Sequence, residues 1–161
     1  KTEGHIDQSL FARNILDEKN GPPPEVNLFN EKNNGETLLK LIENDLVKSA
    51  HDVSLGGIIT AISKMCIRGN KGIKLKKTKN LINEIEYFFS EDQGRYIVEI
   101  ESNNLKYVTD ILDKNSVPNF FVCLQMNAKT PPCFCVSIGC VQDFTSRSPA
   151  PVVLTPLTLK N

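Results

Sequence analysis

The feature that most constrains this chain is a run of small and polar residues placed directly before a long apolar-periodic stretch. Residues 49–57 read Ser-Ala-His-Asp-Val-Ser-Leu-Gly-Gly and lead into the stretch from Ile58 to Ile67. This order predicts a strand or loop that enters a helix whose first turn stays sterically open. The first N–H groups of a helix lack internal partners, so we expect Asp52 or Ser54 to cap them. Such a helix end can hold a phosphate, and the alternative is an ordinary capped helix of the core.

Apolar spacing along the chain predicts an alternation of helices and strands. The clearest strand covers residues 95–100, which are rich in β-branched and aromatic side chains. A helix is expected within residues 1–20, and further helices over residues 35–47, 53–68, 80–87 and 103–114, the last capped by Ser102; short strands are expected at 73–75 and 136–141. The order predicts an α/β (α+β) domain with a mixed or antiparallel sheet and helices packed on one face.

The expected core stripes follow from the same spacing. Helix 35–47 is expected to bury Leu38, Leu39, Leu41, Ile42 and Leu46, and helix 103–114 to bury Leu105, Val108, Ile111 and Leu112.

Composition excludes some classes of partner. The chain has 161 residues, of which 40% are hydrophobic and 24% charged, and its 19 basic side chains balance its 19 acidic ones. A neutral chain gives no electrostatic reason to expect nucleic acid or an acidic membrane surface as a partner. No apolar run approaches the ~20 residues that a membrane helix needs, and the polar start at Lys1 does not resemble a signal peptide. A start without Met is expected for a piece of a longer protein.

The five cysteines do not form a recognisable framework. Their odd number and irregular spacing argue against a disulfide scaffold. Cys133 and Cys135 are one residue apart, which is not the spacing of zinc ribbons or redox sites, so no metal site is expected. Free thiols fit a reducing, cytoplasmic location.

The last part of the chain differs from the rest. From Val122 onward few residues are charged, and four of the five cysteines and five prolines fall there. We expect one domain over residues 1–141, with an apparent insertion at residues 123–129, and a divergent or poorly ordered tail over residues 142–161.

Four segments, in this order, resemble one enzyme family. Residues 4–10 (Gly-His-Ile-Asp-Gln-Ser-Leu) are similar to its "GHLGQSLY", and residues 21–28 carry its "GPPPxVDL" pattern as Gly-Pro-Pro-Pro-Glu-Val-Asn-Leu. Residues 50–58 are similar to "AHDVSDGGL", and residues 89–95 (Phe-Ser-Glu-Asp-Gln-Gly-Arg) to "FSESQSR". The family is formylglycinamide ribonucleotide amidotransferase, or phosphoribosylformylglycinamidine synthase. The resemblance runs from Lys1 to about Pro118 and corresponds to the second of the family's two AIR-synthase-related C-terminal domains.

The resemblance implies an ATP-dependent carbon–nitrogen ligase of purine biosynthesis. The family's enzyme converts formylglycinamide ribonucleotide to the amidine with ATP, Mg²⁺ and ammonia made from glutamine. Its catalytic histidine and magnesium-binding acids lie in domains that this chain does not match, so no catalytic residue and no metal ligand are assigned. Implied partners are the remaining domains of the parent chain and the glutaminase and small accessory subunits of the complex.

The resemblance also implies that this domain contributes scaffold and part of a nucleotide pocket. The residues expected to line that pocket are Ser54, Gly56, Gly57, Glu91, Gln93 and Arg95. The planar donor fork of Arg95 suits a phosphate or a carboxylate. The alternative for Glu91 and Arg95 is a local ion pair at the start of a strand, and for His51 it is a structural, hydrogen-bonded side chain.

Two other functions remain open on sequence grounds. One is a domain of a related ATP-using enzyme, such as AIR synthetase, selenophosphate synthetase or the hydrogenase-maturation protein. The other is a non-catalytic binding or assembly module. Half of a site has no chemistry to perform, so the isolated chain is expected to be inactive.

Overall fold

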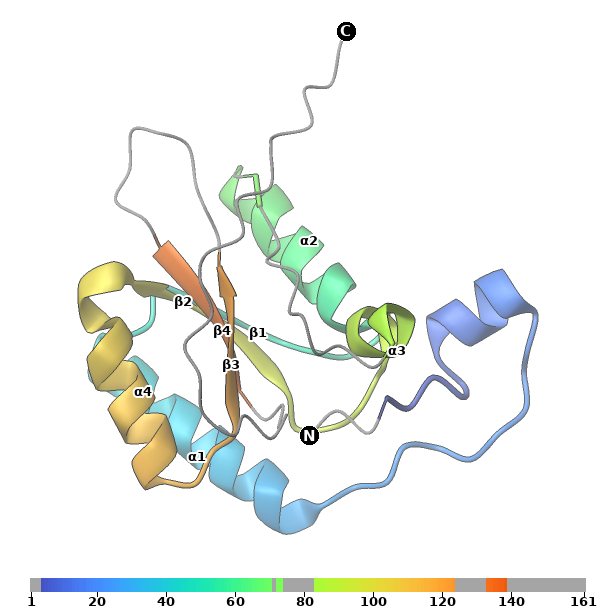
Figure 1. Ribbon diagram of the computed structural model, residues 1–161, viewed down its shortest axis with the longest axis horizontal. Coiled ribbons are helices and arrows are strands. Elements are labelled where there is room, and N and C mark those ends of the chain that lie inside the picture. Colours follow the sequence, from blue (N-terminus) through green and yellow to red (C-terminus); the bar gives the residue numbers. More distant parts are fainter. Residues whose placement is uncertain (1–3, 71, 74–82, 124–132, 139–161) are drawn as a thin grey trace, which may run out of the picture.

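The domain is built on a four-stranded antiparallel sheet with helices around it (Figure 1). The computed structural model describes residues 4–70, 72–73, 83–123 and 133–138. The strands are β1 (Ser49–Asp52), β2 (Tyr96–Glu101), β3 (Asn119–Cys123) and β4 (Cys133–Ile138). Their order in the sheet is β1-β2-β4-β3, and each neighbouring pair is antiparallel. The two central strands are therefore β2 and β4.

Helices connect and cover these strands. The α-helices are α1 (Leu28–Glu43), α2 (Gly57–Gly69), α3 (Glu84–Phe89) and α4 (Leu105–Lys114). A π-helical turn, η1 (Ala12–Leu16), precedes them, and a 3₁₀ turn, η2 (Ser102–Asn104), leads into α4.

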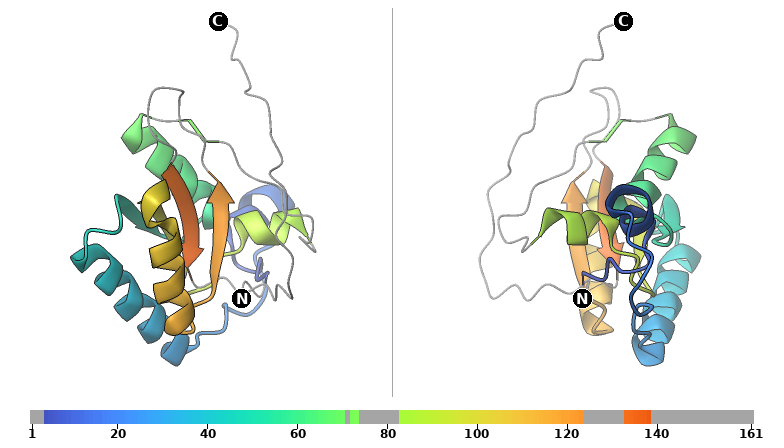
Figure 2. Two further views of the ribbon diagram at one scale, coloured as in Figure 1. Left: turned by 60° about the vertical axis from the view of Figure 1, so that its left-hand side comes forward. Right: turned by 90° about the vertical axis from the view of Figure 1, so that its right-hand side faces the viewer.

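Strand β2 divides the core into two clusters, because successive side chains of a strand point to opposite faces. Val98 and Ile100 belong to the α1/α4 cluster, whose other members are Leu38, Leu41, Leu46, Val108, Leu112 and Val117. Ile97 belongs to the α2/α3 cluster, with Val53, Ile58, Ala61, Ile62 and Tyr87. Figure 2 shows α1 and α4 on one side of the sheet and α3 on the other.

The predicted α/β class with an antiparallel sheet is thus confirmed, but the prediction of helices on one face is wrong. Helices cover both faces, since the three buried apolar residues of β2 supply both clusters. The expectation followed from the order of the elements, which does not specify the side on which each connection crosses the sheet.

Helix α1 begins earlier than predicted, at Leu28 instead of Gly35. The side chain of Asn27 caps it by accepting a hydrogen bond from the Asn30 N–H over 3.0 Å. Because the helix ends at Glu43, Leu46 reaches the core from the following turn. Leu39 and Ile42, predicted to be buried, are 57% and 44% exposed.

Helix α2 also differs at its start. The prediction placed it from Val53, but Val53 continues the β1 ladder by donating its N–H to Arg95 O over 2.8 Å. The N-cap is Gly56, in the left-handed conformation and without a side-chain cap, so Asp52 and Ser54 do not cap this helix. Similarly, Ser102 lies inside η2 and does not cap α4.

The remaining predictions agree with the structure in whole or in part, or fall outside the described residues. The predicted helix 80–87 corresponds to α3, which runs from Glu84 to Phe89, and the predicted strand 136–141 overlaps only the end of β4. Strand 95–100 and the inward stripe of helix 103–114 are confirmed by β2 and α4. Of the predicted strand 73–75, Ile73 is described and lies in no strand, and the other two residues lie outside the described part. The predicted tail, residues 142–161, lies outside it entirely.

Candidate functional site

Glu91 lies at a junction of three chain segments. Its Oε1 accepts a hydrogen bond from the Gly56 N–H over 2.8 Å and another from the Leu10 N–H over 2.8 Å. Its own N–H donates to His5 O over 3.4 Å. The carboxylate therefore joins the N-terminal segment to the start of α2, where the helix dipole favours a negative charge.

The glycine pair at the start of α2 is required by the protein's own packing. Gly57 has φ +70°, and a Cβ there would lie 2.5 Å from Phe88 O and 2.8 Å from Phe89 Cα, both backbone atoms. Gly56 has φ +84°, a conformation that side chains rarely adopt. The glycines were expected to let a ligand come close to the start of α2. At Gly57 the backbone at the end of α3 occupies that space instead. The Gly57 N–H donates to Ser54 O over 3.0 Å.

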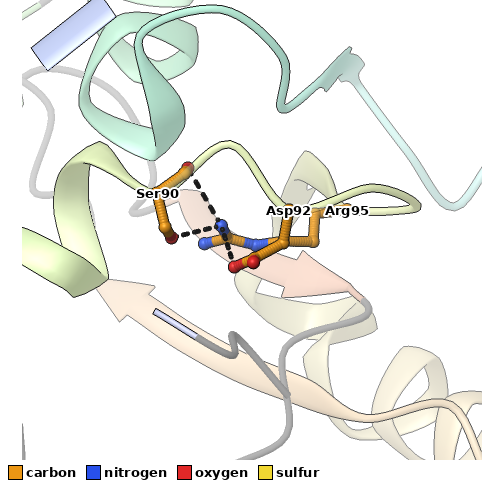
Figure 3. A network of polar contacts seen from close by, with 3 residues as sticks. All are labelled: Ser90, Asp92 and Arg95. Carbon is orange, nitrogen blue, oxygen red and sulfur yellow. Dashed lines mark hydrogen bonds and ion pairs between the residues drawn. The ribbon is translucent and has the colours of Figure 1, made fainter. Parts of the chain in front are cut away.

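Arg95 is buried under the loop that joins α3 to β2 (Figure 3). Its Nη1 donates to Ser90 Oγ over 2.9 Å, to Ser90 O over 3.3 Å and to Asp92 Oδ2 over 3.3 Å. The ion pair that forms is therefore Arg95–Asp92, with Arg95 fully buried and Asp92 nearly so. The local ion pair between Glu91 and Arg95, considered as an alternative on sequence grounds, is replaced by this one.

The other edge of the same guanidinium has no hydrogen-bond acceptor among the described residues. Nε and Nη2 of Arg95 are buried and have no hydrogen-bond acceptor in the described part of the protein. A buried charged donor without an acceptor is costly, so native proteins normally supply one.

The other candidate residues are more exposed. Ser54 and Gln93 are exposed on the surface, beside Gly56 and in the α3–β2 loop respectively. His51 is partly buried, and its Nδ1 lies 2.6 Å from Asp52 O and 3.3 Å from Asp52 Oδ1. The structure therefore brings Ser54, Gly56, Gly57 and Glu91 to one junction and holds Arg95 in the adjoining loop.

Sequence reasoning did not find several contacts that shape this region. The Leu10 amide and the Phe88–Phe89 backbone come from distant segments, and no local pattern reveals them. The rings of Phe11 and Phe89 also meet, with centroids 4.7 Å apart. Asp92 and Ser90 do lie in the same short motif as Arg95, so their spacing offered a signal.

Two titratable groups near the sheet are shifted by their surroundings. Burial raises the pKa of the Tyr96 phenol, and the carboxylates of Glu31 and Asp52 raise it further. Burial, with a smaller contribution from Glu99, raises the pKa of the Cys66 thiol. Both side chains are thus neutral at physiological pH.

The described residues hold neither a candidate metal centre nor a candidate membrane span. There, no three His, Cys, Asp or Glu side chains gather closely enough to hold a metal ion. None of the helices in that part of the chain has the length and apolar character needed to cross a membrane.

Comparison with known proteins identifies the class. Residues 7–129 match the family described as AIR synthase related protein, C-terminal domain. The match includes the α2 start and the α3–β2 loop, and the chain therefore belongs to this family.

Individual relatives carry a more specific name. The chain is 72% identical over 117 residues to the phosphoribosylformylglycinamidine synthase subunit PurL of Pelagibacter ubique, which covers 73% of the chain and 16% of that relative. It is 39% identical over 113 residues to the subunit of the same name from Bartonella henselae, covering 70% of the chain and 15% of the relative. The chain spans about a sixth of the length of these relatives. The resemblance inferred from the four motifs is confirmed.

Proposed function

We propose that this chain is the C-terminal, second AIR-synthase-related domain of a phosphoribosylformylglycinamidine synthase. The observation that carries the proposal is the 72% identity to a subunit of that name over 117 residues. The full protein would be an ATP-dependent carbon–nitrogen ligase of purine biosynthesis, which makes formylglycinamidine ribonucleotide from formylglycinamide ribonucleotide, ATP and glutamine-derived ammonia. Because the relatives seen here are named for this enzyme, we favour it over the other ATP-using enzymes considered above.

Within that protein, the domain would supply scaffold and part of a nucleotide pocket. The lining residues would be Ser54, Gly56, Gly57, Glu91, Gln93 and Arg95, with ATP or ADP and Mg²⁺ as ligands. Two features support this placement. Ser54 and Gln93 are accessible, and Nε and Nη2 of the buried Arg95 carry N–H donors that have no acceptor in the described part of the chain. The Gly56 N–H already has Glu91 as its acceptor, so a phosphate at the start of α2 would have to displace that carboxylate.

The partners and location of the protein are part of the same proposal. The domain would contact the remaining domains of its parent chain, and the parent would work with glutaminase and small accessory subunits in the cytoplasm. No nucleic acid and no membrane would be involved. The isolated domain would be inactive, because the groups that carry out the reaction would lie in other domains.

Calorimetric titration of the purified chain with ADP and Mg²⁺ tests the nucleotide pocket. A substitution of Gly57 would not be a clean test of binding, since a side chain at that position meets backbone atoms of Phe88 and Phe89. We instead choose Ser54→Ala and Gln93→Ala, which remove accessible polar groups, and expect each to weaken binding by about three- to tenfold through loss of one hydrogen bond.

Ser63→Ala is the matched control. Ser63 is an exposed serine on the body of α2, and its Oγ donates a local hydrogen bond to Ile59 O over 2.7 Å. Saturable ADP binding that Ser54→Ala and Gln93→Ala weaken and Ser63→Ala leaves unchanged would support the pocket. Absence of binding at millimolar ADP would assign the domain to scaffold alone.

A turnover assay tests the proposed inactivity. The purified chain is mixed with formylglycinamide ribonucleotide, ATP, Mg²⁺ and ammonia, and ADP release is followed. We expect a rate equal to that of the buffer, and turnover by the chain alone would contradict the proposal.

A further inference from the structure

The guanidinium of Arg95 is anchored through only one of its edges. A guanidinium has five N–H donors in a fixed planar fork. Within the described residues, the guanidinium of Arg95 donates hydrogen bonds through Nη1 alone. Their acceptors are two oxygens of Ser90 and one of Asp92. The edge formed by Nε and Nη2 carries the other three N–H groups, and these atoms are buried with no acceptor in the described part of the chain.

We propose that the Nε–Nη2 edge of Arg95 is an oxyanion-binding edge, which takes two oxygens of a phosphoryl group. The inference rests on the proposed nucleotide-binding function and deepens it by naming the atoms that meet the phosphate. Two parallel N–H donors match the spacing of two oxygens on one phosphorus, and charge-assisted bidentate bonds are the strongest such contacts in proteins. The phosphoryl group can come from a nucleotide or from free inorganic phosphate.

The anchor on Nη1 prepares this edge for binding. Arg95 N–H contacts with Ser90 and Asp92 hold the guanidinium plane in one orientation, so little side-chain entropy is lost when a ligand arrives. The side chain is 0% exposed, and low surrounding polarity strengthens a charge-assisted bond.

Asp92 limits the strength of the site. Its carboxylate lies against Nη1 with a single oxygen at 3.3 Å and already offsets much of the arginine's charge. A phosphate at the opposite edge would meet this negative charge at short range. Removing the charge of Asp92 while keeping its shape should therefore strengthen phosphate binding.

Access requires local opening at the exposed turn of the loop between α3 and β2. Residues Ser90 to Gly94 form this loop, Gln93 within it is exposed, and Gly94 has φ +68°. Ser90 and Asp92 are buried and hold Nη1, so opening confined to the exposed turn at Gln93 can admit a small anion while that anchor stays in place.

Nuclear magnetic resonance of the arginine Nε–H groups tests the proposal directly. The ¹⁵N-labelled chain is titrated with inorganic phosphate at constant ionic strength, with chloride as the balancing ion. We expect the Arg95 Nε–H signal to shift saturably, while the signals of the exposed Arg13 and Arg68 stay in place and serve as internal controls.

Two variants sharpen the result. Asp92→Asn keeps an acceptor for Nη1 but removes the charge, and we expect it to bind phosphate about tenfold more tightly, as expected for loss of a like charge within several ångströms. Arg95→Lys keeps the charge but loses the fork, and we expect binding at least about tenfold weaker. Circular dichroism of each variant checks that it is folded, and the Asp92→Asn result stands even if Arg95→Lys does not fold.

The outcomes separate this inference from the proposed function. An Arg95 signal that does not move with phosphate in the folded wild type and in Asp92→Asn overturns the inference and leaves water as the partner of that edge. ADP binding without an Arg95 shift also overturns it while the nucleotide pocket stands. A phosphate shift without ADP binding supports the oxyanion edge and overturns the nucleotide pocket.

Discussion

The carboxylate of Glu91 accepts a hydrogen bond over 2.8 Å from the backbone N–H of Gly56, at the start of α2. An anion is thus bound at this helix terminus, and it belongs to the protein itself. The same oxygen also accepts from the Leu10 N–H, so one side chain joins segments 35 and 81 residues away from it. The residues singled out for ligand binding therefore also have a structural role.

Substitution of Glu91 tests that role. We expect Glu91→Ala to lower the free energy of unfolding by about 1–3 kcal/mol, since two backbone N–H groups lose their acceptor. Glu91→Gln keeps an oxygen in place and should cost less, about 0.3–1 kcal/mol for loss of the charge at the helix terminus. Urea unfolding followed by circular dichroism measures both. Equal stability of Glu91→Ala and wild type would show that the junction contributes nothing.

Gly57 is expected to tolerate no side chain. Gly57→Ala places a methyl group 2.5 Å from Phe88 O at a positive φ, and we expect a loss of about 2 kcal/mol or more. Gly72→Ala is the matched control, because a Cβ there meets none of the described residues within 4 Å, and it should change stability by less than about 0.5 kcal/mol. Thermal melting of the two variants compares them, and similar melting temperatures would contradict the close approach.

Two neighbouring leucines of α1 separate the buried face from the exposed one. Leu41 is 0% exposed and Leu39 57% exposed. Leu41→Ala removes a core side chain and should cost about 2–5 kcal/mol. Leu39→Ala should stay within about 0.5 kcal/mol of the wild type. Chemical denaturation measures the unfolding free energy of both variants. A large loss of stability in Leu39→Ala would mean that Leu39 is buried, as the sequence predicted.

The pair formed by Lys48 and Glu101 predicts a pH dependence. Lys48 Nζ lies 2.6 Å from Glu101 Oε1, and its hydrogen bond and charge lower the pKa of the Glu101 carboxyl from 4.5. Because the folded-state pKa is the lower one, the pair stabilises the fold above pH 4.5 and loses this effect as the pH falls through the folded-state value.

Glu101→Gln provides the comparison. The difference in unfolding free energy between wild type and Glu101→Gln should be small at neutral pH, since both side chains are largely exposed, and should vanish in acid. Melting curves at a series of pH values measure it. A difference that grows as the pH falls would contradict the direction of the pKa shift.

The sequence predicted the elements whose signal is local. Strand 95–100 and the inward stripe of α4 follow from side-chain periodicity within one segment, and the structure has both. The start of α1 was missed because Asn27 caps the helix and lets it begin at Leu28, ahead of the predicted start at Gly35. The start of α2 was missed because Val53 extends β1 by a bond to Arg95, more than 40 residues away.

The candidate site shows the same division. The motifs at residues 50–58 and 89–95 pointed to two segments that the structure brings together through the Glu91–Gly56 hydrogen bond, because their order and composition are visible in the chain. The hydrogen-bond and ion-pair partners of each side chain could not be predicted from these motifs. Arg95 pairs with Asp92 and not with Glu91, since Glu91 turns toward the amides of Gly56 and Leu10.

By itself, then, the amino-acid sequence determined the family, the α/β class and the two segments that build the candidate site. Tertiary structure alone decided that helices lie on both faces of the sheet, that Gly57 makes room for the α3 backbone, and that one edge of Arg95 has no acceptor among the described residues. The physical reason is distance along the chain: periodicity and capping act between near neighbours, whereas burial and hydrogen bonding between distant segments depend on how the whole chain packs.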